Sequence, residues 1–132
     1  MAQYRQHADK AEMFWDLAQK RYAENGTPFL CMNLVMYTVG HLLEALLAKE
    51  GRHPGSPVRG VPHADRGALM RSHLVGEGRL TEADAACYFK LVSDRDTFIE
   101  GGVQTRSFVE AYLATARPLI SRLQTLVARS EA

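Results

Sequence analysis

The sequence lacks several features that would assign it to a familiar class of protein. It has only two cysteines, Cys31 and Cys87, and no C-x-x-C pair, which argues against a zinc knuckle or a redox motif. We expect both thiols to be buried and free in a cytoplasmic protein. The N-terminal residues have no apolar core, so no signal peptide is predicted. The formal net charge of +1 argues against a general nucleic-acid binder, although it leaves room for a local basic patch.

The motifs that identify common enzyme families are also missing. No serine lies in a Gly-x-Ser-x-Gly elbow, and no Gly-x-x-x-x-Gly-Lys loop is present to bind phosphate. The glycines between Gly55 and Gly60 follow no strand pattern, so they indicate a plain loop rather than a dinucleotide site.

What the sequence does contain is a helical pattern. Apolar residues recur every three or four positions along most of the chain, and no segment alternates in the manner of a β-strand. The stretch 52–62 is rich in proline and glycine and is the one long loop. We therefore expect an all-α fold, an antiparallel four- to five-helix bundle that forms one domain over residues 1–132. The expected helices span 4–22, 28–51, 63–74, 81–100 and 107–128.

Local signals mark the ends of several helices. The segments 81–84 and 107–110 both resemble capping boxes, in which a Thr or Ser and an acidic residue three positions later bind each other's backbone N–H groups. Gly76 and Gly78 are expected to end the short helix at 63–74. Pro118 is expected to kink the last helix or divide it, because proline removes a backbone donor.

The stretch 28–51 is the most apolar of the expected helices, yet one polar stripe runs along it. By length alone it could span a membrane, but its polar side chains favour a buried helix of a soluble protein, with no membrane partner. At about 100° per residue, the polar side chains fall within roughly 80° of one another. They are Asn33, Tyr37, His41 and Glu44. We take these four as candidate ligand-binding residues, because a polar stripe on a buried helix must face polar groups or a cleft.

Arg95 is the second unusual residue, because it shares a helix face with apolar residues. An isolated charge costs several kcal/mol to bury, so an acidic partner is expected. Glu44 is the first candidate for that partner, and Asp96 and Glu100 are local alternatives. Arg95 could instead contact the phosphate of a ligand, or extend its head to the surface.

His41 and Glu44 stand three positions apart and so could both bind a metal ion from one helix face. A metal site needs further ligands, and only His63 or His73 suggests itself from the sequence. Neither has a neighbouring partner in a recognisable pair. We therefore expect His41 to be a hydrogen-bonded interior histidine, and the chain to hold no stoichiometric metal and no cofactor.

Three segments, taken in order, resemble the HEPN domain family. The run from Tyr37 to Gly51 (Tyr-Thr-Val-Gly-His-Leu-Leu-Glu-Ala-Leu-Leu-Ala-Lys-Glu-Gly) is similar to the second helix of these domains. A loop and His63 follow, then the segment 71–80, then Arg95-Asp-Thr-Phe-Ile-Glu-Gly. The resemblance extends over residues 5–128. It rests on the joint order of these segments, because each alone is a loose match.

The resemblance implies a small all-α domain that forms dimers, often beside a nucleotidyltransferase partner in toxin–antitoxin pairs. Catalytic members resemble metal-independent RNases that use an Arg, four to six variable residues and a His. Arg95 matches the Arg, but the positions for the His hold Glu100, Gly101 and Gly102. We therefore expect a HEPN-like binding or regulatory module that forms a homodimer, lacks RNase activity, and either partners a nucleotidyltransferase or binds a nucleotide or RNA.

Two alternatives stay open. One is a divergent metal-independent RNase in which Arg95 acts with Glu100 as a weak substitute for the missing His. The other is an unrelated helical bundle that binds a metal ion through His41 and Glu44. A homodimer is expected on separate grounds, because the helix at 28–51 is too apolar for three neighbours to cover and a near-zero net charge does not oppose association.

Overall fold

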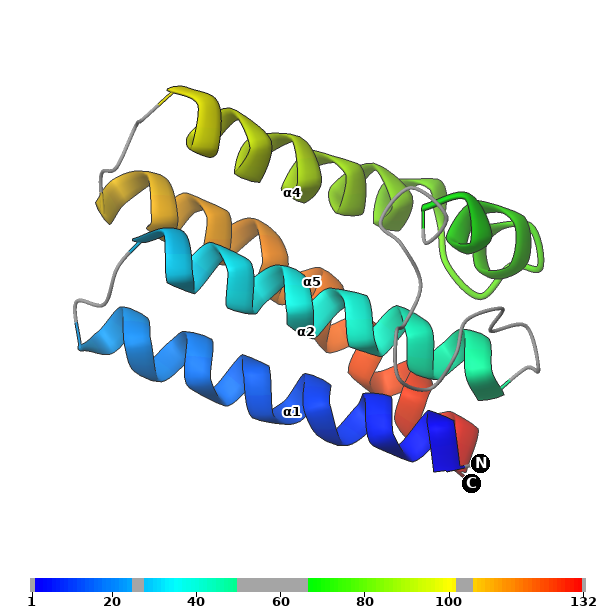
Figure 1. The fold of residues 1–132 in the computed structure, drawn as a ribbon. Coiled ribbons are helices and arrows are strands. Elements are labelled where there is room, and N and C mark those ends of the chain that lie inside the picture. Colours follow the sequence, from blue (N-terminus) through cyan, green and yellow to red (C-terminus); the bar gives the residue numbers. More distant parts are fainter. Residues whose placement is uncertain (1, 25–27, 50–66, 102–105, 132) are drawn as a thin grey trace.

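The computed structural model describes residues 2–24, 28–49, 67–101 and 106–131, and this part of the chain is helical throughout apart from short turns, with no strand. The elements are α1 (Ala2–Ala23), α2 (Pro28–Lys49), η1 (Met70–Val75), α4 (Glu82–Gly101) and α5 (Arg106–Glu131). They form an all-α helical bundle, as the sequence predicted (Figure 1). The expected loop at 52–62 lies outside the described residues.

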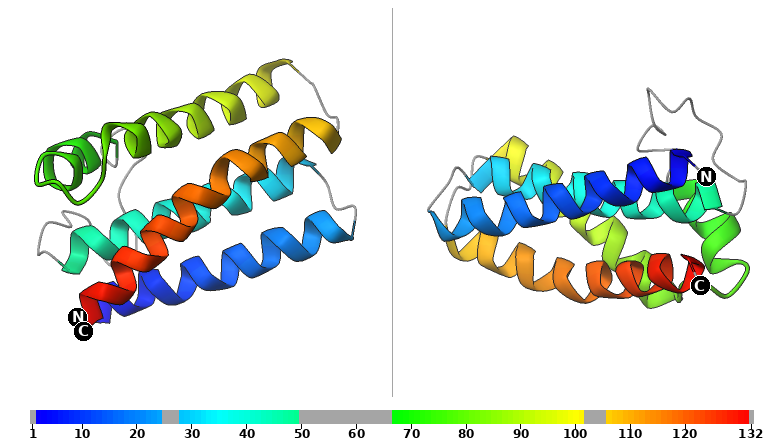
Figure 2. Two further views of the ribbon diagram at one scale, coloured as in Figure 1. Left: turned by 180° about the vertical axis from the view of Figure 1, so that it is seen from behind. Right: turned by 90° about the horizontal axis from the view of Figure 1, so that it is seen from below.

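Helix α2 occupies the centre of the bundle. It contacts α1, α5, α4 and η1. α1 and α2 run antiparallel side by side, α5 lies behind them, and α4 runs antiparallel to α5 (Figures 1 and 2). A helix that is apolar around most of its girth needs neighbours on several sides, and this arrangement supplies them.

The core of the protein is built on α2. Its buried apolar residues are Cys31, Met32, Leu34, Val35, Met36, Val39, Leu42, Leu43, Ala45, Leu46 and Leu47. The segment Leu30–Ala48 is long and apolar enough to cross a membrane by length and composition, but 78% of it is buried inside the bundle. That burial is what a core helix shows, and it means that most of the apolar surface of α2 is covered within one chain.

The predicted helix ends agree with the structure in part. The capping box before α4 is present: the backbone N–H of Asp84 donates to Thr81 Oγ1 (3.1 Å), and the backbone N–H of Thr81 donates to Asp84 Oδ2 (2.9 Å). Gly78 has a φ of +78°, which glycine adopts without strain, in the turn that follows η1. The segment before that turn is a π-helix, in which Gly76 N–H donates to the carbonyl of Arg71 (2.9 Å).

One expectation for the last helix needs correction, and one of the two alternatives given for Pro118 is excluded. α5 begins at Arg106, so Ser107 lies inside the helix and does not occupy the N-cap position that the predicted capping box required. Pro118 also lies inside α5, which continues as one helix from Arg106 to Glu131 and is not divided there. Packing accounts for this, because Leu119 and Ile120 beside the proline are buried in the core and hold both halves in place.

Both cysteines are free thiols, as expected, but only Cys31 is fully buried. Cys87 is half-buried, and its Sγ donates to the backbone carbonyl of Thr115 on α5 (3.3 Å). Tyr112 makes a similar link in the opposite direction: its hydroxyl donates to the carbonyl of Leu91 on α4 (3.0 Å), inside the core. Burial raises the pKa of Tyr112 well above its ordinary range, so the hydroxyl stays protonated and able to donate.

Replacing Tyr112 by Phe should therefore destabilise the protein by about 1 kcal/mol, because one buried hydrogen bond between α4 and α5 is lost while the ring still fills its place. Urea unfolding of the two proteins measures this. Tyr37→Phe is the matched control, because the Tyr37 side chain is 46% exposed, and it should leave stability unchanged. Equal stability of the Tyr112→Phe and wild-type proteins would contradict the prediction.

Candidate functional site

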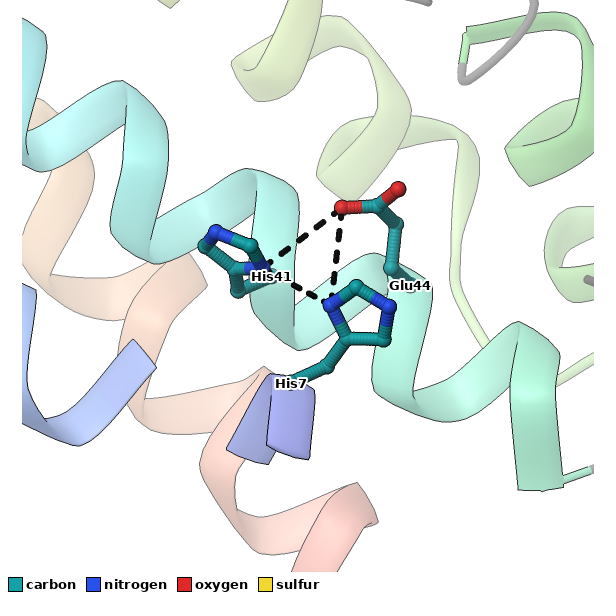
Figure 3. Close-up of side chains that lie close together, drawn as sticks. All are labelled: His7, His41 and Glu44. Carbon is teal, nitrogen blue, oxygen red and sulfur yellow. Dashed lines mark hydrogen bonds and ion pairs between the residues drawn. The ribbon is translucent and has the colours of Figure 1, made fainter. Parts of the chain in front are cut away.

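Three polar side chains that could carry chemistry meet between α1 and α2. His41 and Glu44 come from one face of α2, as the i, i+3 spacing predicted, and His7 comes from the N-terminal half of α1. Figure 3 shows the three side chains pointing toward one another across the gap between the two helices. We call His7, His41 and Glu44 the histidine–glutamate cluster.

The nitrogen and oxygen atoms of the histidine–glutamate cluster converge on one point. His7 Nδ1 lies 2.8 Å from His41 Nδ1, so the Nδ1–H of one ring donates a hydrogen bond to the Nδ1 of the other. Glu44 Oε2 lies 3.6 Å from His41 Nδ1 and 3.8 Å from His7 Nδ1. These two distances allow an ion pair when a ring is protonated but are too long for a direct hydrogen bond. The hydrogen bond expected of His41 is thus present, although its side chain is only partly buried.

Burial and ring packing hold the histidine–glutamate cluster in place. The side chains of His7 and Glu44 are only 4% and 1% exposed, whereas that of His41 is 20% exposed. The His41 ring is stacked between His7 (ring centroids 5.0 Å apart) and Phe14 (5.6 Å). Phe14 also contacts the ring of Tyr37 (5.3 Å). The cluster therefore has a rigid buried side and one side that solvent reaches.

The predicted pair between Arg95 and Glu44 is wrong. Glu44 faces the histidines of the cluster, on the α1 side of α2. Arg95 instead donates a hydrogen bond from Nη1 to Asn33 Oδ1 (3.3 Å), and its Nη2 lies 3.6 Å from Asp96 Oδ1. The reason is the position of the two residues along α2, because Glu44 lies three turns beyond Asn33 and at that level α1, not α4, supplies the polar partner.

Arg95 is held at the edge of the core with its charge only partly neutralised. Its side chain is 17% exposed, and within the described part of the chain its Nε has no hydrogen-bond acceptor. Asn33 is neutral, and the Asp96 side chain is 56% exposed, so solvent weakens that ion pair. This arrangement leaves the guanidinium group able to donate hydrogen bonds to a further, anionic partner.

The polar stripe that the sequence predicted on α2 is thus divided between two places. Asn33 belongs with Arg95, whereas His41 and Glu44 belong with His7. Tyr37 lies between them, half exposed and against Phe14. The side chain of Glu100, the weak candidate base, and the whole of His63 lie outside the described residues. His73 lies on η1 and is not part of the histidine–glutamate cluster.

His7 is the residue that reasoning from sequence missed. A signal was present, because His7, Ala11, Phe14 and Ala18 follow the helical spacing of one face of α1. Ala11 and Ala18 are buried and Phe14 is partly buried against the core. A histidine on that face had to be buried as well and needed a polar partner. The sequence did not say which helix would face it.

These contacts make opposite predictions for two pairs of substitutions. His7→Ala and Glu44→Ala should be coupled by about 0.5–3 kcal/mol, because the two residues share one polar cluster. Arg95→Ala and Glu44→Ala should be additive within about 0.5 kcal/mol, because they have different partners. Urea unfolding of the single and double variants at one protein concentration measures both cycles. Strong coupling in the second cycle and none in the first would show that the observed pairing is wrong.

Comparison of the chain with models of protein families, with curated proteins and with solved structures finds no match. The resemblance to HEPN domains therefore rests on the sequence segments quoted above. What the protein binds must be argued from Arg95 and from the histidine–glutamate cluster.

Proposed function

We propose that the protein is a HEPN-like binding module without RNase activity, which forms a homodimer and binds a phosphate-bearing ligand through Arg95. The observation that carries the proposal is the state of the guanidinium group. It is largely buried, its closest polar partner is the neutral amide of Asn33, and in the described part of the chain its Nε lacks an acceptor. A desolvated cation in this state favours an anion, and arginine pairs well with phosphate oxygens.

The neighbouring surface of α2 supports a binding role. Leu30 and Tyr37 are large apolar side chains that are 40% and 46% exposed. With Asn33 they follow the i, i+3, i+7 spacing of one helix face. An exposed tyrosine offers a flat surface on which a base can stack. The exposed side chains of Leu30 and Tyr37 on this face also suit contact with a second copy of the chain.

The HEPN resemblance agrees with both parts of the proposal. It assigns Arg95 to the position of the arginine that contacts RNA in catalytic relatives, and it leaves out the histidine that would complete their reaction. A protein that keeps only the arginine keeps a contact to phosphate without a general acid or base. A nucleotidyltransferase is the protein partner that this resemblance suggests.

Binding of a fluorescently labelled oligouridylate tests the role of Arg95. Arg95→Gln should weaken binding about tenfold or more, because one charged hydrogen bond to phosphate is lost. Arg117→Gln removes the same charge from an exposed position on α5 and should change affinity by less than about twofold. ATP as a competitor separates the two sources of phosphate, because displacement at micromolar concentrations identifies a nucleotide site and its absence identifies an RNA site.

The same samples test the absence of catalysis. The oligouridylate should stay intact during incubation with wild-type protein, because no histidine follows Arg95 at the required spacing. Cleavage that Arg95→Gln abolishes would support the alternative of a divergent RNase. Equal binding by the wild-type, Arg95→Gln and Arg117→Gln proteins would contradict a site at Arg95.

The homodimer is tested by sedimentation at micromolar concentration. The wild-type protein should sediment at twice the 14.7 kDa of one chain. Tyr37→Glu should shift it toward the monomer, because a charge on the exposed face of α2 opposes close contact there. Met13→Glu, at a 54% exposed position on α1, is the control and should stay dimeric. A wild-type monomer would rule out the dimer.

A further inference from the structure

We propose that the histidine–glutamate cluster is a binding site for a first-row divalent transition-metal ion, with zinc as the representative. The ligands are Nδ1 of His7, Nδ1 of His41 and one carboxylate oxygen of Glu44. This reverses the expectation drawn from the sequence, which found two of these ligands and no third. It is independent of the phosphate site, because it lies between α1 and α2 and shares no residue with Arg95 and its partners.

The spacing of the three donor atoms fits a shared ion. For tetrahedral zinc with bonds of about 2.0–2.1 Å, two donor atoms lie about 3.3 Å apart. The cluster has separations of 2.8, 3.6 and 3.8 Å, so each pair is within about half an ångström of that value. Small rotations of the side chains would place all three atoms at bonding distance from one central ion. Figure 3 shows the three groups already directed at a common point.

Only one of the three contacts within the histidine–glutamate cluster is short enough for a hydrogen bond. A single proton between the two Nδ1 atoms satisfies that pair, but neither Nδ1 is close enough to donate a hydrogen bond to Glu44 Oε2. Two imidazole nitrogens and a carboxylate oxygen are electron-pair donors of the kinds that metal ions take as ligands. A divalent cation between them would bond to all three donors.

The type of donor selects the class of metal. Calcium and magnesium prefer sites made of oxygen atoms, whereas imidazole nitrogen suits zinc, iron, nickel and copper. Two histidines and one carboxylate form the ligand set of both open zinc sites and non-haem iron sites. His41 and Glu44 supply two ligands from one helix turn, and His7 supplies the third from the neighbouring helix. A metal bound here would join α1 to α2.

The exposure of the cluster allows an ion to enter. Glu44 and His7 are buried, which fixes their positions before binding, while the 20% exposure of the His41 side chain leaves one side open to solvent. Water reaching that side can complete the coordination shell. Phe14, stacked on the His41 ring, limits its rotation and so holds Nδ1 toward the other two ligands.

Calorimetric titration of the metal-free full chain with zinc tests the site. One ion should bind per chain, and the melting temperature should rise when zinc is added. His7→Asn, His41→Asn and Glu44→Gln should each weaken binding more than about tenfold, since even an outer partner of a metal ligand contributes that much. His73→Asn removes a histidine outside the cluster and should bind zinc like the wild-type protein.

Two further measurements keep the test decisive if a variant is less stable. Circular dichroism selects the variants that are folded at the titration temperature, and only these are compared. Cobalt(II) in place of zinc should give the weak visible bands of nitrogen and oxygen ligands, without the charge-transfer band that a cysteine ligand produces. The proposal is overturned by any of three results: no zinc binding, binding that His7→Asn leaves unchanged, or a cysteine-to-cobalt band.

Discussion

The burial of α2 is the constraint on which the rest of the structure depends. Its apolar residues cover most of its circumference, so α1, α4 and α5 must all pack against it. This packing fixes how the helices are arranged around α2 and turns their apolar faces toward it. It also means that each polar residue of α2 that enters the core must meet a polar group there, because an unpaired buried polar group is destabilising.

Those polar residues are satisfied by different neighbours at different levels of the bundle. Near the start of α2, Asn33 accepts a hydrogen bond from Arg95 on α4. Nearer its end, His41 and Glu44 meet His7 on α1. One polar stripe thereby contributes to two separate places, one with a partly neutralised cation and one with a group of electron-pair donors. These are the two chemistries that we assign to anion binding and to metal binding.

The two places differ in what their side chains can bind. Arg95 keeps a permanent positive charge and can offer only hydrogen bonds and attraction to an anion. The histidine–glutamate cluster can accept a proton or a metal ion, and its donors are held by burial and by stacking on Phe14. A ligand bound between α1 and α2 would stiffen the pair of helices that carries Tyr37 and Phe14. The proposed phosphate-binding surface includes Tyr37, on the same helix α2.

The sequence by itself determined the all-α bundle and the central place of α2, because helical periodicity and apolar content are local properties of the chain. It also determined the capping box at Thr81 and Asp84, and the shared face of His41 and Glu44, since both follow from spacing within one helix. Only the tertiary structure decided that Glu44 meets His7 and not Arg95, and that α5 runs unbroken through Pro118. The physical reason is that periodicity gives the face on which a side chain lies, whereas its partner depends on which helix packs against that face and at what level.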